Sequence, residues 1–122
     1  MIILKDDVPV KTVTGLHGGE GRLISRNFLD LEKSLGAGRV FSVSTLEEGA
    51  SVAWHVHGGD SETLYILRGA ARVADGDGSL HILKPGDVAF CPDGEGHSIE
   101  AEGGPVDYIS IILFTKQQEF DL

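Results

Sequence analysis

The sequence predicts an all-β fold, a sandwich or a barrel, with a jelly roll as the preferred arrangement. Short runs of β-branched and aromatic residues alternate with turn residues along the chain, and a single segment has helical character. Glycine makes up 17 of 122 residues, which is about twice its usual share of roughly 7%. These glycines lie between the apolar runs, so we interpret them as turn residues. The length is that of one domain, which we expect to span residues 1–122.

Nine runs of the chain are predicted as strands, because each is short, apolar and bounded by glycine, proline or small polar residues. In chain order they are residues 22–28, 40–46, 51–57, 62–67, 71–74, 80–83, 88–91, 97–101 and 106–114. Many short strands with almost no helix are typical of a double-sheet sandwich or a barrel.

Turn chemistry and one short helical segment connect these strands. Asp75-Gly-Asp-Gly78 predicts a hairpin turn, and Lys84-Pro-Gly-Asp87 predicts a second turn, in which proline presets φ and glycine allows a positive φ. Residues 30–36 have the character of one or two helical turns, with Asp30 as N-cap and Gly36 as the residue that ends them.

The predicted last strand, residues 106–114, is apolar on both of its faces. These faces carry, on one side, Ile109, Ile111 and Leu113 and, on the other, Tyr108, Ile112 and Phe114. A small barrel or sandwich has one interior, so the second apolar face needs a cover. We expect a homodimer contact to supply it. The alternative is that the terminal segments 1–14 and 115–122 fold over this face.

Charge and composition exclude several classes of partner. Nineteen acidic against ten basic residues give a net charge of −9, so we expect neither a nucleic-acid-binding surface nor attraction to an anionic membrane. The longest apolar run, residues 108–114, is far shorter than the roughly 20 residues of a membrane span. Cys91 is the one cysteine and has no internal disulfide partner, which favours a reducing, cytoplasmic location.

Four residues indicate a metal site. His55 and His57 are two positions apart, so on a strand both imidazoles leave the same face. A third imidazole, His97, and one carboxylate, Glu62, complete a nitrogen and oxygen set that suits one divalent ion of Fe, Mn, Ni, Co or Zn. Asp60, in the glycine-containing loop before Glu62, is the competing carboxylate. Glu62 is preferred because the next strand continues directly from it.

The two segments that carry these residues resemble the paired motifs of the cupin superfamily. The first reads Gly49, five residues, His55-x-His57, four residues, Glu62, six residues and Gly69. The second reads Gly86, five residues, Pro92-x-Gly94, two residues and His97. The resemblance implies a cupin-type jelly-roll β-barrel with a core at about residues 40–114, and metal ligation by His55, His57, Glu62 and His97. The family often has asparagine where this chain has Ala101, which is not a ligand position.

The resemblance also implies a function. Similar small cupins include dioxygenases, decarboxylases, lyases and isomerases that act on small polar or carboxylate-bearing molecules. Four protein ligands leave open positions on a six-coordinate ion, where a substrate or O2 can bind. We therefore expect a metalloenzyme whose reaction and general base the sequence does not assign. The alternative is a non-catalytic module that binds or senses a small molecule.

Other residues allow more than one interpretation. Leu64, Ile66 and Ile99 are expected to form an apolar wall around the metal site, joined by Phe41 and Val43. The glycine-rich segment around His17 is interpreted as a plain loop, with a mobile lid as the alternative. His81 is expected at the surface, and Cys91 is expected to be a small buried apolar residue. Arg22 and Arg26 share one face of a strand, where they could meet a carboxylate substrate or surface acids.

Overall fold

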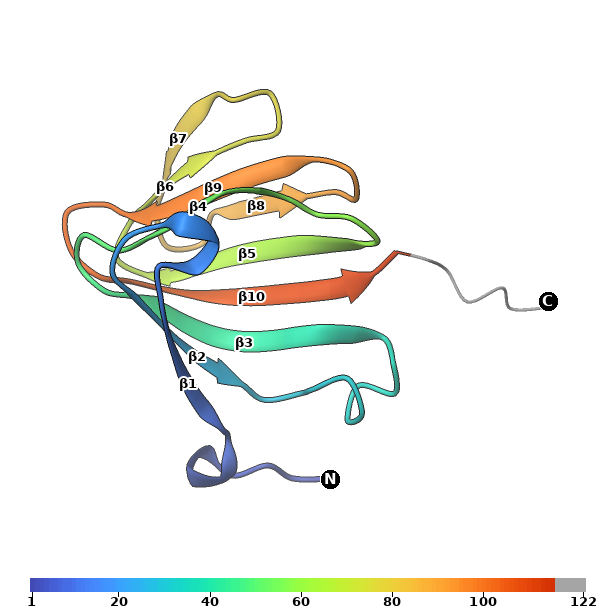
Figure 1. The fold of residues 1–122 in the computed structure, drawn as a ribbon. Coiled ribbons are helices and arrows are strands. Elements are labelled where there is room, and N and C mark those ends of the chain that lie inside the picture. The colour runs from blue at the N-terminus through green and yellow to red at the C-terminus, as the bar shows by residue number, and fades with distance from the viewer. Residues whose placement is uncertain (116–122) are drawn as a thin grey trace.

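A computed structural model describes residues 1–115 of the chain (Figure 1). Residues 116–122 lie outside the described residues, and they make up most of the C-terminal segment that was the alternative cover for the second apolar face. Ten strands account for most of the described residues. They are β1 (Val10–Thr14), β2 (Arg22–Asn27), β3 (Gly38–Leu46), β4 (Ser51–Val56), β5 (Asp60–Arg68), β6 (Ala71–Ala74), β7 (Leu80–Leu83), β8 (Val88–Cys91), β9 (Gly96–Ala101) and β10 (Val106–Phe114). Two short 3₁₀ helices, η1 (Lys5–Asp7) and η2 (Leu16–Gly18), flank β1.

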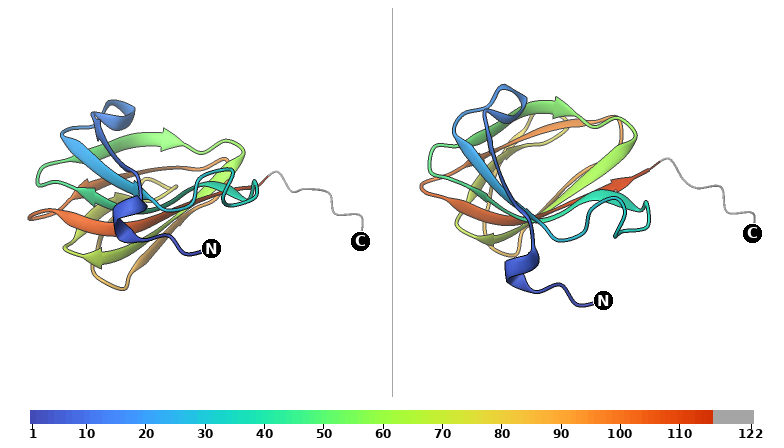
Figure 2. Two further views of the ribbon diagram at one scale, coloured as in Figure 1. Left: turned by 90° about the horizontal axis from the view of Figure 1, so that it is seen from below. Right: turned by 60° about the horizontal axis from the view of Figure 1, so that its bottom comes forward.

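The strands form two antiparallel sheets that face one another. One sheet has the order β1-β2-β3-β10-β5-β8 and the other has the order β4-β9-β6-β7. Figure 2 shows the two layers from two further directions, with η2 beside the start of β4. From β3 onward the chain crosses between the sheets at almost every connection, which is typical of a jelly roll. Within residues 1–115 no strand pairing closes the two sheets into a barrel, so the sandwich form of the prediction is the one observed.

The predicted strands are confirmed, with shifts of one or two residues at some ends. Four of them, β6, β7, β8 and β10, have the predicted bounds. The strand that was not predicted is β1, which pairs with β2 at the edge of the larger sheet. Four of its five residues are β-branched, which was the available signal, but most of its side chains are exposed and no apolar face marks it. This segment extends the sheet at its edge.

Of the one or two helical turns predicted at residues 30–36, a single turn forms, in which the backbone N–H of Ser34 donates to the carbonyl of Asp30 at 2.9 Å. The segment forms consecutive hydrogen-bonded turns without a helix, although the backbone N–H of Lys33 does donate to Asp30 Oδ1 at 2.7 Å, as in an N-cap. Leu35 and Gly36 have positive φ angles of 56° and 80°, which end the helical geometry after a single turn. Both 3₁₀ helices in residues 1–115 are three residues long, so no helix described there can cross a bilayer.

The hydrophobic core lies between the two sheets. Its buried members include Leu46, Leu64, Ile66, Ile99 and Val106, which confirms the predicted burial of Leu64, Ile66 and Ile99. The prediction that Phe41 and Val43 line the interior is wrong. On β3 the even-numbered residues face inward, as the burial of Ser42 and Ser44 shows, and the odd-numbered residues lie on the outer face.

Candidate metal centre

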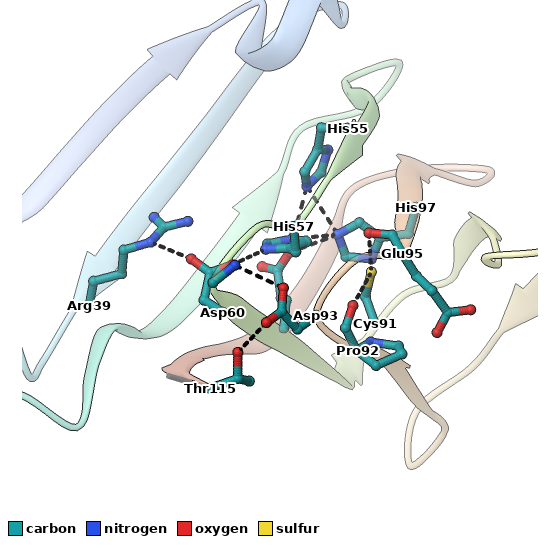
Figure 3. A network of polar contacts seen from close by, with 12 residues as sticks. Arg39, His55, His57, Asp60, Cys91, Pro92, Asp93, Glu95, His97 and Thr115 are labelled. Carbon is teal, nitrogen blue, oxygen red and sulfur yellow. Dashed lines mark hydrogen bonds and ion pairs between the residues drawn. The ribbon is translucent and has the colours of Figure 1, made fainter. Parts of the chain in front are cut away.

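The four predicted metal-site residues come together between the two sheets. His55 on β4 pairs in register with His97 on β9, so strand pairing places two imidazoles side by side. His57 follows β4 directly, and Glu62 projects from β5 of the opposite sheet. Figure 3 shows the three imidazoles pointing toward one another. The site therefore depends on the sandwich, because neither sheet alone supplies both the imidazoles and the carboxylate.

The spacing of the donor atoms fits a single ion. The Nε2 atom of His97 lies 3.0 Å from that of His55 and 3.2 Å from that of His57. Glu62 Oε1 lies 2.9 Å from His97 Nε2 and 3.2 Å from His57 Nε2, and all four donor atoms lie within 4.8 Å of one another. Neighbouring ligands at right angles, each about 2.1 Å from one metal ion, are separated by about 3.0 Å. The chemistry and the spacing of this donor set both suit a divalent transition metal.

The rings of His55 and His57 are held in the tautomer that a metal requires. His55 Nδ1 lies 2.8 Å from the carbonyl oxygen of Ala53, and His57 Nδ1 lies 2.7 Å from Asp60 Oδ1. Both oxygen atoms are acceptors, so each Nδ1 carries the proton and donates it. In the neutral ring each Nε2 is then left with a free lone pair that points into the site, whereas in the protonated ring of His57 Nε2 carries a proton and can donate to Glu62.

Asp60 is a partner of a histidine and is not part of the four-donor group. Its Oδ1 accepts the hydrogen bond from His57, and its Oδ2 accepts one from Arg39 Nε at 3.0 Å (Figure 3). The structure groups Glu62, the carboxylate preferred from the sequence, with the three imidazoles, whereas Asp60 contacts the outer nitrogen of one of them. Carboxylates in this position fix the ring and raise the basicity of the ligand nitrogen.

Glu62 is a carboxylate held in its ionised form. Burial alone would raise the pKa of Glu62, but its contacts with the three histidines and the hydrogen bond from Ser110 outweigh burial and hold the pKa well below its ordinary value. Ser110 Oγ donates to Glu62 Oε2 at 2.5 Å, which leaves Oε1 facing the imidazoles. The hydrogen bond to Glu62 raises the pKa of His57; burial opposes this shift and the bond to Asp60 reinforces it.

The donor group opens into a cavity of about 700 Å³ between the sheets. Apolar side chains, among them Val52, Leu64 and Ile99, line part of it, and Ser25, Ser44 and Ser110 add hydroxyl groups. Three basic residues, Lys11, Lys33 and Arg39, also line it. Such a space admits a small molecule beside the four donors, with polar groups placed to orient it.

Sequence reasoning missed several residues of this cavity. Ser110 could have been found, because it interrupts the buried apolar face of β10 that Tyr108 and Ile112 share. His17 lies in the loop predicted as plain, yet its ring stacks on that of His55 with centroids 4.1 Å apart and planes 8° apart. Arg39 carries no sequence signal, because its role follows from a contact with Asp60, 21 positions away.

The remaining candidates lie outside the cavity lining. His81 is exposed on β7, as predicted, and its Nε2 lies 2.8 Å from the hydroxyl of Ser79. Arg22 forms a two-point ion pair with Glu47, and Arg26 donates to Thr45 at 3.2 Å. Arg22 therefore meets a surface acid, as one of the two interpretations expected, whereas Arg26 contacts a threonine hydroxyl that neither interpretation named.

Cys91 is expected to resist modification while the protein is folded. The side chain is buried beside the backbone oxygen of Glu95, and burial, followed by the charges of Glu62 and Glu95, raises its pKa to about 11. Roughly a thousandth of the thiol is ionised at pH 8, so a disulfide-forming thiol reagent should label the folded chain far more slowly than the chain in denaturant. Equal labelling rates in the two conditions would contradict the burial of this thiol.

Comparison with known proteins gives consistent matches. The family model described as "Cupin domain" matches residues 42–112. An oxalate-binding protein of Thermotoga maritima is 31% identical over 114 residues, which cover 93% of each chain. The crystal structure of a predicted oxalate decarboxylase from the same organism has a TM-score of 0.86 at 30% identity, covering 93% of this chain and 99% of that one. KdgF from Halomonas sp. has a TM-score of 0.74 at 16% identity, covering 95% and 96% of the chains, which indicates the same fold alone.

Proposed function

The chain belongs to the cupin family, and we propose that it is a metal-dependent cupin that acts on a small carboxylate-bearing molecule of the oxalate class. The observation that carries this proposal is the convergence of three imidazoles and one carboxylate, at 2.9–3.2 Å around His97, in a cavity large enough for a small ligand. The names of two relatives at 30% and 31% identity, an oxalate-binding protein and a predicted oxalate decarboxylase, support the choice of ligand class.

In this proposal His55, His57, Glu62 and His97 hold one divalent ion of Fe, Mn, Ni, Co or Zn. The ion, when bound, supplies Lewis-acid chemistry to a ligand at its open positions. The protein's part is to keep the three Nε2 lone pairs and Glu62 Oε1 aimed at one point. Hydrogen bonds from the outer nitrogen atoms of His55 and His57, and from Ser110 to Glu62, do this.

The charges of the cavity favour an anionic ligand. Three basic residues, Lys11, Lys33 and Arg39, line this cavity together with three acidic residues, Asp30, Asp60 and Glu62, and Glu62 belongs to the donor group. Arg39 is paired with Asp60, whereas no carboxylate within residues 1–115 lies within 4.0 Å of the ammonium group of Lys11 or Lys33. Once these pairings are counted, Lys11 and Lys33 outnumber Asp30 in the lining, and the two lysines can attract and orient a carboxylate that enters the cavity.

Binding of oxalate to the metal-loaded protein tests this proposal. Calorimetry on the Mn²⁺-loaded parent should detect oxalate, and the double variant Lys11→Glu/Lys33→Glu should bind it at least about tenfold more weakly at low salt, because like charges then repel. The difference should shrink as salt is added. The variant Lys5→Glu/Lys84→Glu, which makes the same change in net charge outside the cavity, is the matched control and should bind as the parent does. A metal-loaded parent that binds no oxalate or other small carboxylate would contradict the proposal.

The sequence leads us to expect a dioxygenase, decarboxylase, lyase or isomerase. Of these four reactions we prefer a metal-dependent decarboxylase. The preference follows the predicted activity in the name of one relative. Binding without turnover is the second candidate, and the name of the other relative favours it. Release of CO2 from labelled oxalate by the loaded parent, and its loss in the variant lacking His55 and His97, would support the enzyme. Tight binding without release would support the binding module.

We further propose that the outer face of the larger sheet forms a homodimer contact. Strand pairing aligns two rows of side chains across this face, one formed by Val43, Ile109, Tyr65 and Val88 and the other by Phe41, Ile111, Thr63 and Phe90. Several of them are large and exposed, including Val88 and Phe90 at 55% each. A contiguous apolar surface of this kind is typical of an interface, and a second copy offers a face of the same shape and character.

A single charge on this face is expected to separate the dimer. Light scattering should give the parent twice the mass of one chain, and Tyr65→Glu should give the mass of one chain, because a buried, unpaired carboxylate is costly at an apolar contact. Leu80→Glu places the same charge on an exposed apolar position of the other sheet and should leave the dimer intact. A parent with the mass of one chain would contradict this proposal.

The other partners in the proposal follow from composition. We propose a cytoplasmic protein whose partners are a small molecule and a second copy of itself, with neither nucleic acid nor membrane among them. The support is the net charge of −9 together with a single buried, unpaired cysteine in residues 1–115.

A further inference from the structure

The imidazole ring of His17 lies flat against the imidazole ring of His55. The two ring centroids are 4.1 Å apart and the ring planes differ by 8°. His17 belongs to the loop of residues 15–21, which includes η2, and it lines the cavity of the proposed metal centre. We propose that His17 is a positioning residue that holds the His55 ring in its metal-binding orientation by stacking. This inference rests on the proposed function, because it concerns a ligand of the proposed metal ion.

The ring of His55 has fewer polar constraints than that of His57. His57 donates to Asp60, a buried carboxylate that Arg39 also contacts. His55 Nδ1 has a single carbonyl partner two residues away, on its own strand, and its Nε2 faces the other donor atoms. Rotation of the His55 ring out of the site is therefore opposed by one hydrogen bond and by the stacked ring of His17.

The loop that carries His17 is docked on the strand that carries His55. The backbone N–H of Ser51, at the start of β4, donates to the carbonyl of Glu20 at 2.8 Å, and the backbone N–H of Glu20 donates to Ser51 Oγ at 2.9 Å. Gly19 packs so closely on this strand that an added Cβ would lie 2.1 Å from the carbonyl oxygen of Ser51. These contacts fix the loop, and with it His17, relative to His55.

Parallel stacking also explains why His17 acts on a ligand and is not one itself. The lone pair of each imidazole lies in the plane of its ring, so two parallel rings direct their lone pairs along separate planes. His17 accordingly does not belong to the group of four donors that lie within 4.8 Å of one another. An imidazole bound to a cation loses electron density, and the electron-rich face of a neighbouring aromatic ring stabilises it. The stack should therefore favour the metal-loaded state.

Titration with Co²⁺ tests this inference by metal affinity and by the visible absorption of the bound ion, independently of any activity. We expect His17→Ala to bind Co²⁺ roughly 3- to 10-fold more weakly than the parent, the range that one aromatic pair contributes, and to change the absorption bands. His17→Phe keeps a flat ring and should bind within about twofold of the parent. Gly19→Ala should reproduce the effect of His17→Ala by displacing the loop.

The matched control is His81→Ala, which removes an exposed imidazole outside the cavity and should leave both readouts unchanged. Unaltered affinity and absorption in His17→Ala would overturn the inference. Equal losses in His17→Phe and His17→Ala would also overturn it, because they would show that the nitrogen atoms matter and the stacking does not. A parent that binds no Co²⁺ would instead refute the proposed function itself, so the two failures are distinguishable.

Discussion

The double variant His55→Ala/His97→Ala is expected to bind Mn²⁺, Co²⁺ or Zn²⁺ at least about a thousandfold more weakly than the parent. Removing one residue that hydrogen-bonds a metal ligand lowers metal affinity by roughly 10- to 100-fold. This variant removes two of the four ligands themselves, so its loss should be larger. The two rings face each other in register across β4 and β9, with Nε2 atoms 3.0 Å apart. Calorimetric titration measures the affinities directly.

The same variant should lose the stabilisation that a bound metal gives to the fold. A ligand at 100 times its Kd stabilises a protein by about 2.7 kcal/mol, so the parent should unfold at a clearly higher temperature with metal than without. The double variant should show no such rise, and His81→Ala should show the full rise. A rise of equal size in the parent and in the double variant would place the metal elsewhere on the chain.

The rise in unfolding temperature caused by Mn²⁺ is expected to be larger at pH 8 than at pH 6. His57 must lose its Nε2 proton before it can bind a metal, and the hydrogen bond to Glu62 raises the pKa of His57 above its ordinary value of 6.5. Below that raised pKa the ion competes with a proton, and its affinity falls by up to about tenfold per pH unit for each proton displaced. Melting curves with and without Mn²⁺ at pH 6, 7 and 8 measure the effect.

The metal-free protein should show the opposite trend in this range. The raised pKa of His57 contributes stability that is fully present below pH 6.5 and is lost as the pH rises through the raised pKa. The lowered pKa of Glu62 contributes stability that is present above pH 4.5 and is lost as the pH falls through the lowered pKa. Between pH 6 and pH 8 the contribution of Glu62 is constant and that of His57 falls, so the metal-free fold weakens as the pH rises, while metal binding strengthens. If Mn²⁺ raises the unfolding temperature no more at pH 8 than at pH 6, this account is contradicted.

Much of the fold was predictable because short-range patterns determine it. Turn residues bound β6, β7 and β8, and glycine or proline marks the ends of these strands, so their bounds could be read from the chain. The strand that escaped prediction, β1, lies at the edge of a sheet and lacks a buried face. Of the one or two helical turns predicted at residues 30–36 a single capped turn forms, because the positive φ angles of Leu35 and Gly36 end it.

Of the candidate site, only the four proposed metal ligands could be predicted from the sequence. The spacing of His55 and His57 places both on one face, and the family resemblance supplies Glu62 and His97. The residues that hold these ligands come from distant parts of the chain. Ser110 lies 48 positions from Glu62, and the ring of His17 reaches His55 from a separate loop. Such contacts depend on the register and stacking of strands, which a single sequence does not specify.

The metal content of the purified protein tests the central claim most directly. The parent and the variant His55→Ala/His97→Ala would each be loaded in turn with Fe, Mn, Co, Ni and Zn, dialysed, and measured by plasma mass spectrometry. The proposed site predicts close to one equivalent of at least one of these metals per chain in the parent, and almost none in the variant. No retained metal in either protein, or equal retention in both, would contradict a metal centre formed by these four residues.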